Sequence, residues 1–235
     1  MDKLIRIGMD TSKSVFVLHG LNAAERPVLR RKLRRQQVLE FFARLEPTKV
    51  GLEACGAAHY WARELQALGH EVLLLPPEYA KAYLKRNKND AADAAAICEA
   101  MSRPKMRFVA VKTVEQQDVQ AVHRVRRGLI EQRTAKGNQI RGLVSEYGLV
   151  APRELVQLQR AVPLWLEDAG NGLSVRFRRL LKALWCDLRL LDERVAELDR
   201  EIALIAHGEP AARRLQQLRG VGPVIATALV VGRTD

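Results

Sequence analysis

The sequence predicts a mixed α/β domain followed by a region of long helices. Residues 1–110 alternate short β-branched runs with helical patterns, whereas helical spacing of apolar residues dominates from Val114 onward. A chain of 235 residues with 48% hydrophobic content is long and apolar enough to bury a core. We therefore expect a mixed sheet with helices on its faces, and then elongated helices.

Three strands open the N-terminal part. The apolar runs at 4–9 and 15–21 are separated by a short polar turn, which is typical of a hairpin. The third strand, at 27–35, is rich in basic residues, namely Arg30, Arg31, Lys32, Arg34 and Arg35. Such charges indicate an exposed edge strand, where they either discourage edge pairing or contact nucleic acid.

Helices and strands alternate after this hairpin region. Helical patterns at 36–45 and 60–68 flank an apolar run at 49–53, and a further strand at 72–75 ends at Pro76-Pro77. A new helix is expected to begin within residues 87–93. This order predicts that the strands at 4–9 and 49–53 belong to one sheet.

Four carboxylates stand at the ends of these elements. Asp10 and Glu53 follow apolar strands, while Asp90 and Asp93 lie three residues apart on the first turn of a helix and share one face. Taken singly, each acid is explained by a turn, a salt bridge or a helix cap. Together, in a basic chain, they favour a site for Mg²⁺, or Mn²⁺ in its place, that supports phosphoryl transfer.

The composition points to a polyanionic partner. The formal net charge is +12, which predicts nucleic acid as the default ligand, although solubility or anionic lipid would also explain a basic surface. The three cysteines form no CxxC pair, so we expect Cys55, Cys98 and Cys186 to fill cores. With no signal-peptide pattern and no membrane span, we expect a cytoplasmic protein.

Two long helices are predicted in the second half, at 114–147 and 175–206. Pro152, Pro163 and the turn at 170–172 indicate an irregular connection between them. The first helix carries the basic residues Arg124, Arg126 and Arg127, which are candidates for contacts with nucleic acid. In the second, apolar residues follow a continuous 3-4 spacing from Leu181 to Ile205, which predicts a coiled coil with the first helix or with a second protomer.

The segment 215–229 has the pattern LxxLxGVGxxxAxxL, which is typical of a helix-hairpin-helix. Its turn contains Gly220 and Gly222 and would present backbone N–H groups to a phosphate without reading base sequence. A purely structural turn between two helices is the alternative. There is no Walker A loop and no GxGxxG after the first strand, so nucleotide-dependent functions lose support.

These motifs resemble the DEDD transposases of bacterial insertion sequences. The matching segments are IGMDTSK at 7–13, GLEACG at 51–56, KNDAADA at 88–94 and LRGVG at 218–222. The resemblance implies an RNase H-like (RuvC-like) domain in which Asp10, Glu53, Asp90 and Asp93 bind Mg²⁺. Lys88, in the third of these segments, is a further candidate for a contact with nucleic acid. It further implies DNA strand cleavage and exchange, a guide RNA, and a homodimer or homotetramer assembled through the coiled coil.

The resemblance also sets the expected domain limits: a RuvC-like domain at 1–112, long helices at 113–207, and at 208–235 the start of a C-terminal transposase domain. Family members carry a serine in that last domain, and the sequence ends at Asp235 before it, so we expect a truncated domain. The alternatives are a stand-alone junction nuclease and a non-catalytic nucleic-acid-binding assembly protein. A sugar-kinase-like fold is a further alternative, but the sequence lacks the phosphate-binding loops of that fold.

Overall fold

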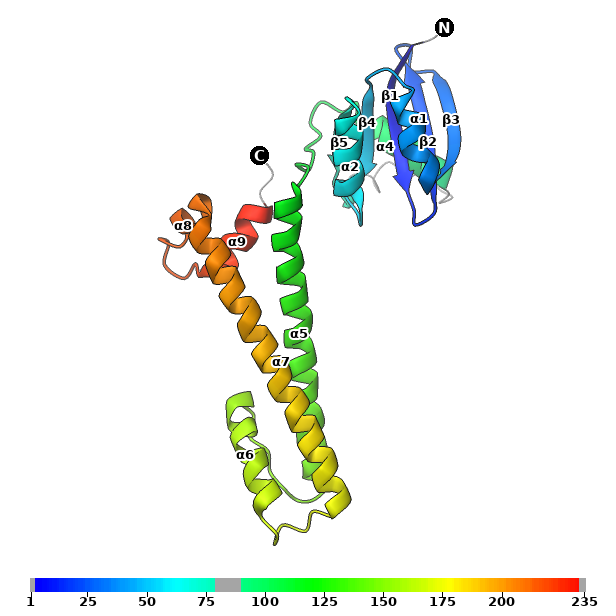
Figure 1. Ribbon diagram of the computed structural model, residues 1–235. Helices are drawn as coiled ribbons and strands as arrows, with labels where there is room; N and C mark the ends of the chain where they lie inside the picture. The colour runs from blue at the N-terminus through cyan, green and yellow to red at the C-terminus, as the bar shows by residue number, and fades with distance from the viewer. Residues whose placement is uncertain (1–2, 79–89, 233–235) are drawn as a thin grey trace. The chain divides into compact units, whose positions relative to one another are not determined.

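The computed structural model describes residues 3–78 and 90–232, which form two compact units that divide after Val114. The N-terminal unit contains the whole sheet, and Glu115–Gly232 form the helical unit. Both are drawn in Figure 1. The helices at the end of the chain belong to the same unit as the two long helices, and the predicted three-part division stays a prediction.

The N-terminal unit is a five-stranded mixed sheet in the order β3-β2-β1-β4-β5. Strands β1 (Leu4–Thr11), β2 (Val15–Asn22) and β3 (Pro27–Arg34) are antiparallel neighbours, whereas β4 (Lys49–Glu53) and β5 (Glu71–Leu75) run parallel to β1. The predicted α/β class, the hairpin and the basic edge strand are confirmed. In the β1–β2 turn the Ser12 hydroxyl accepts a hydrogen bond from Val15 N–H (3.1 Å), which fits the turn role.

Helices cover both faces of this sheet (Figure 1). On one face lie α1 (Val38–Ala43), preceded by the 3-10 turn Arg35–Gln37, and α2 (Ala58–Ala67). Their residues Phe42 and Trp61 pack with Ile7, Phe16 and other strand residues in the main core. On the other face lies α4 (Asp90–Ala100), whose Ile97 packs in a smaller cluster with Leu75.

The helical unit is built on an antiparallel pair, α5 (Val114–Ser145) and α7 (Val175–Gly208). Three ion pairs join the two helices: Arg126–Asp199, Arg133–Asp192 and Lys136–Asp187. As the residue number of the partner on α5 increases, that of the partner on α7 decreases, so the two helices are antiparallel. The two long helices are therefore confirmed, and α5 supplies a partner for α7 within the chain. A coiled coil between protomers stays a prediction.

The predicted irregular connection is wrong in part, because it contains α6 (Leu155–Glu167) with Pro163 inside it. A proline within a helix has no N–H for the carbonyl four residues earlier, here Gln159. In this fold the indole Nε1–H of Trp185, on α7, donates to that carbonyl (3.2 Å). A contact distant in sequence thus compensates for the proline, and local pattern could not reveal it.

The chain ends in two short helices, α8 (Pro210–Leu215) and α9 (Pro223–Gly232), joined by a turn in which Gly220 has φ +87°. A left-handed conformation of this kind favours glycine.

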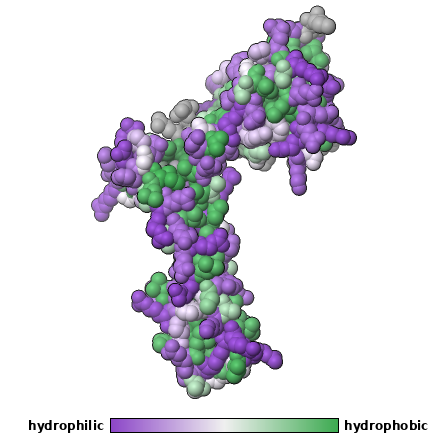
Figure 2. All heavy atoms as spheres, viewed as in Figure 1, coloured by the Kyte–Doolittle hydropathy of each residue, from purple (hydrophilic) through white to green (hydrophobic). Residues whose placement is uncertain are grey.

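The expectation that the three cysteines fill cores is correct only for Cys98, because Cys55 and Cys186 are exposed. Hydrophilic residues cover much of the outer surface, and apolar residues lie between them along the helical unit (Figure 2).

Candidate active site

Asp10 and Glu53 stand at the carboxyl ends of two adjacent parallel strands. β1 pairs with β4 in the register Gly8↔Gly51 and Met9↔Leu52, so the two acids follow directly at the same edge. Alternation along a strand places Asp10 on the face of Gly8 and Glu53 on the face of Gly51. Both acids are half-buried, and Thr11 Oγ1 contacts Cys55 Sγ (3.6 Å) just beyond them.

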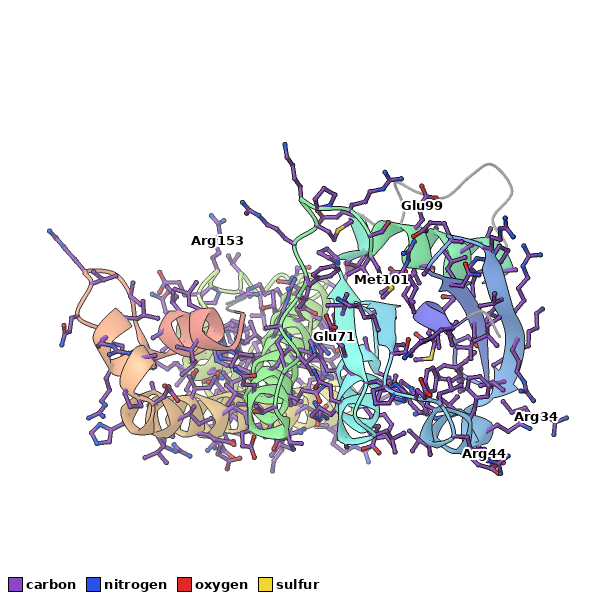
Figure 3. All side chains as sticks on the ribbon, turned by 90° about the horizontal axis from the view of Figure 1, so that it is seen from above. Arg34, Arg44, Glu71, Glu99, Met101 and Arg153 are labelled. Atoms are coloured by element: carbon purple, nitrogen blue, oxygen red, sulfur yellow. The ribbon has the colours of Figure 1, made fainter. Side chains whose placement is uncertain are left out.

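Two glycines allow α4 to lie directly on that face. A Cβ atom at Gly8 would lie 2.1 Å from the carbonyl oxygen of Ala94 and 2.5 Å from the backbone nitrogen of Cys98. A Cβ at Gly51 would lie 2.3 Å from Met101 Sδ. Figure 3 shows Met101 on the sheet side of α4 and Glu99 on its outer side. Glycine inside a strand commonly marks such a close approach.

Arg6 fixes the direction of α4 relative to β1. Its Nε donates to the carbonyl of Cys98 (3.1 Å), and its guanidinium also pairs with Glu25, whose hydrogen bond raises the pKa of Arg6. Since Cys98 lies at Arg6 and Ala94 lies at Gly8, α4 runs antiparallel to β1. Its first turn therefore lies toward the end of β1 that carries Asp10.

Asp93 occupies this first turn, four residues before Ile97 and on the same side of the helix. A Cβ at Gly51 would lie 3.1 Å from Ile97 Cγ2, so this side of α4 is over β4, the strand that ends in Glu53. The Oδ1 atom of Asp93 is buried, and no hydrogen-bond partner for it exists among the described residues. A buried carboxylate oxygen without a partner is costly unless a cation or another donor joins it.

The other predicted site residues are placed as follows. Asp90 begins α4, but its side chain and Lys88 lie outside the described residues. Within the part of the chain that is described, no group of three or more His, Cys, Asp or Glu side chains is close enough to hold a metal ion. The structure thus brings Asp10, Glu53 and the first turn of α4 to one edge, and a metal site there stays a prediction.

The predicted basic residues separate into different environments. Arg30, Arg31, Lys32, Arg34 and Arg35 are exposed on or just after the edge strand β3, and Figure 3 shows Arg34 extending outward. On α5, Arg124 and Arg127 are exposed, whereas Arg126 is partly buried against Asp199. Gly220 and Gly222 lie in the exposed turn between α8 and α9.

Sequence reasoning missed the structural roles of Gly8, Gly51 and Arg6. A glycine in the middle of each of two apolar strands was the available signal, because glycine weakens a strand unless something must approach it. Cys98, by contrast, is no nucleophile candidate, because burial raises the pKa of its thiol. Sequence reasoning also missed His19, which pairs with Gly8 and so lies on the face that carries the acids; strand alternation was the available signal.

A mixed sheet in this order, with acids at the ends of β1 and β4 and on a helix laid across them, has the RNase H-like arrangement. A profile of DEDD transposases of the IS110 type, described as a transposase, matches residues 7–149. The chain is 45% identical over 237 residues to a Pseudomonas aeruginosa protein named "Probable family 20 transposase", covering 99% of this chain and 69% of that protein.

Two further relatives are transposases of named elements. The transposase for insertion sequence element IS1111A of Coxiella burnetii is 39% identical over 229 residues, covering 97% of this chain and 63% of the relative. The transposase for insertion sequence element IS1328 of Yersinia enterocolitica is 35% identical over 235 residues, covering 100% of this chain and 70% of that protein. The chain therefore belongs to the IS110 family of DEDD transposases.

The chain spans between 60% and 70% of the length of the curated relatives it matches, the lower value being for a protein of Sinorhizobium fredii. None of the described helices combines the length and apolar character needed to cross a membrane.

Proposed function

We propose that this chain carries out Mg²⁺-dependent DNA strand cleavage and exchange during transposition of an insertion sequence. The observation that carries the proposal is the buried Oδ1 of Asp93, which has no hydrogen-bond partner among the residues the structure describes and lies on a helix held over the ends of β1 and β4. Membership of the transposase family supplies the substrate class, DNA.

The donor set fits a hard divalent cation. Asp10 and Glu53 would hold the ion from the sheet, and Asp93 and Asp90 would hold it from α4, because Mg²⁺ prefers carboxylate oxygen ligands. Mn²⁺ has similar ligand preferences and would replace it. When bound, the ion would lower the pKa of an attacking water or hydroxyl and stabilise the charge on the leaving oxygen. The residues of the chain keep these oxygens in place, since Gly8 and Gly51 fix the height of α4.

The proposed partners are DNA, a guide RNA and further copies of the chain. The net charge of +12 supports binding to nucleic acid, because Lys and Arg contacts to phosphates release counterions. The guide RNA follows from the family resemblance alone. Assembly into a dimer or tetramer is supported by the seam of α7, in which Leu184, Leu191 and Leu198 are only partly buried by their own chain.

The turn between α8 and α9 is proposed as a second contact to the DNA backbone. Exposed backbone at Gly220 and Gly222 precedes α9, and a helix N-terminus favours anions. In this role the segment holds DNA in position without specifying sequence, since contacts to phosphate carry no base information.

Titration calorimetry with Mg²⁺ or Mn²⁺ on the full chain tests the metal proposal. We expect Asp10→Asn and Asp93→Asn each to weaken binding by at least about tenfold, a loss that even outer-shell partners of metal ligands cause. Asp118→Asn, an exposed position on α5, is the matched control and should bind as the unaltered chain does. Equal affinity in all three variants would contradict the proposal.

An activity assay distinguishes transposition from hydrolysis. Asp10→Asn and Asp93→Asn should each abolish Mg²⁺-dependent processing of DNA that carries the ends of the element, whereas Asp118→Asn should not. Efficient hydrolysis of a four-way junction by this chain alone, without strand exchange, would instead favour a junction nuclease. Unchanged recombination in Asp10→Asn would favour the non-catalytic assembly role.

A further inference from the structure

A groove lies on the sheet face that carries the acids, between α4 and the edge strand β3. It has a volume of about 450 Å³ and is lined by His19, Arg30, Arg31, Lys32, Ala91 and Ala95, among others. Small alanine side chains of α4 line one side of the groove, and basic residues of β3 line the other. The groove belongs entirely to the N-terminal unit.

Strand register connects this groove to the candidate active site. Lys32 pairs with Val17, and Val17 pairs with Asp10, so the three lie in one row across the sheet. Residues opposite one another in neighbouring strands point to the same face. Strands are about 4.8 Å apart, so the Cα atoms of Lys32 and Asp10 are separated by about 10 Å. One strand of duplex DNA advances about 3.4 Å per nucleotide, so this is roughly three nucleotides.

The basic residues of β3 divide between the two faces of the sheet. Arg31 lines the groove as well, but its guanidinium group lies over the ring of Phe41 (5.2 Å), which packs on the opposite face. The guanidinium group of Arg35, the residue just after β3, lies over the ring of Trp61 (4.9 Å). These contacts favour a structural role for the two arginines. Arg30 and Lys32 occupy the groove side, and no described carboxylate forms an ion pair with either of them.

His19 adds a neutral hydrogen-bond donor to the groove. It pairs in register with Arg30 on one side and with Gly8 on the other. Burial, together with the charge of Arg30, lowers the pKa of His19. The imidazole is therefore uncharged at pH 7 and can offer a ring N–H to an acceptor such as a phosphate oxygen.

From these observations we infer that the α4–β3 groove binds the backbone of the DNA strand that is processed at the acids, with Arg30 and Lys32 contacting phosphates about three nucleotides from the scissile bond. Arg30 and Lys32, which pair with none of the described carboxylates, lie in a concave site on the face that carries the acids, and they complement the phosphate backbone of DNA. The inference rests on the proposed function for the identity of the strand. It assigns Arg30 and Lys32 to binding and Arg31 and Arg35 to packing.

Fluorescence anisotropy of a labelled 30-base-pair DNA with the full chain, in EDTA, tests the inference. The double variant Arg30→Gln/Lys32→Gln should weaken binding about tenfold to fiftyfold at 100 mM salt and should lower the slope of log K against log [salt] by about two. The matched control Arg26→Gln/Lys105→Gln removes two exposed charges of the same unit and should change affinity less than about threefold. Equal effects of the two double variants would overturn the inference.

A steric variant separates the groove from general charge. Ala95→Trp fills the groove without changing charge and should weaken DNA binding at least about fivefold, with circular dichroism confirming the fold. If this variant and the groove double variant weaken binding only to an RNA of the same sequence, the inference is wrong. The DNA-binding measurement is made in EDTA and so does not depend on metal. Groove variants that lose DNA affinity but bind Mg²⁺ normally therefore test the groove separately from the metal site. If Asp93→Asn leaves Mg²⁺ affinity unchanged, the metal proposal fails while the groove stands.

Discussion

Gly8 of β1 lies directly beneath Ala94 of α4, so closely that a Cβ at position 8 would lie 2.1 Å from the Ala94 carbonyl oxygen. Because that oxygen belongs to a helix backbone, it cannot turn aside as a flexible side chain would. The contact therefore fixes how far α4, and the acids on its first turn, stand above the sheet.

Gly8→Ala should lift α4 from the sheet and lower the free energy of unfolding by about 3 kcal/mol, the upper range for overpacking. Affinity for Mg²⁺ should fall with it, since Asp93 would move away from Asp10 and Glu53. Urea denaturation and metal titration measure the two effects. Gly128→Ala on α5 is the control, because its Cβ meets no atom within 4 Å; it should add about 0.5 to 1 kcal/mol of stability. Equal stability of the two variants would contradict this role of Gly8.

Trp185 and Pro163 should be energetically coupled through the carbonyl of Gln159. Trp185→Phe removes the indole donor to that oxygen and should cost about 1 to 3 kcal/mol, since the partly buried acceptor loses this hydrogen bond. Pro163→Ala restores a backbone N–H, so it should stabilise the Trp185→Phe background more than the unaltered chain. A double-mutant cycle by chemical denaturation measures the difference. Strict additivity would show that the hydrogen bond contributes nothing.

The ion pair of Arg133 with Asp192 should stabilise the α5–α7 pair more than a surface pair does. Asp192 also accepts a hydrogen bond from Gln159 Nε2 (3.0 Å) on α6, and the side chain of Arg133 is only 25% exposed. Asp192→Ala should therefore cost about 1 to 3 kcal/mol. Glu193→Ala, which breaks an exposed pair with Arg189, should cost less than about 1 kcal/mol. Comparison of the two denaturation midpoints tests this ranking.

Stability of the helical unit should fall in mild acid through His123. Its Nε2 lies 2.9 Å from Thr227 Oγ1, and that hydroxyl donates to the Pro223 carbonyl (2.8 Å), so the neutral ring donates to it. Burial and Arg126 lower the pKa of His123 below its ordinary 6.5. An unfolded chain then binds the proton more readily, so stability is full above about pH 6.5 and declines below it.

Thermal unfolding between pH 7.5 and 5.5 tests this expectation. His123→Gln should unfold with a smaller dependence on pH than the unaltered chain, while His207→Gln, at an exposed position near the end of α7, should keep the full dependence. An NMR titration that places the pKa of His123 above 6.5 would contradict the assignment.

Much of the architecture was predictable because it depends on local pattern. Short apolar, β-branched runs bounded by turn signals identified the five strands of the described sheet, and sustained apolar spacing identified α5 and α7. Local pattern failed at α6, since a proline normally ends a helix and its compensation comes from Trp185 on another helix. It also failed at Cys55 and Cys186, whose exposure is set by packing.

The sequence by itself determined which acids this protein offers and which family it belongs to, because residue type and spacing are properties of the chain alone. Only the tertiary structure decided how they meet. Parallel pairing of β1 with β4 brings the ends that carry Asp10 and Glu53 together, and Gly8 with Gly51 lets α4 cross above them. Strand register likewise decided which basic residues of β3 lie on the same face of the sheet as the acids, because alternate side chains along a strand point to opposite faces.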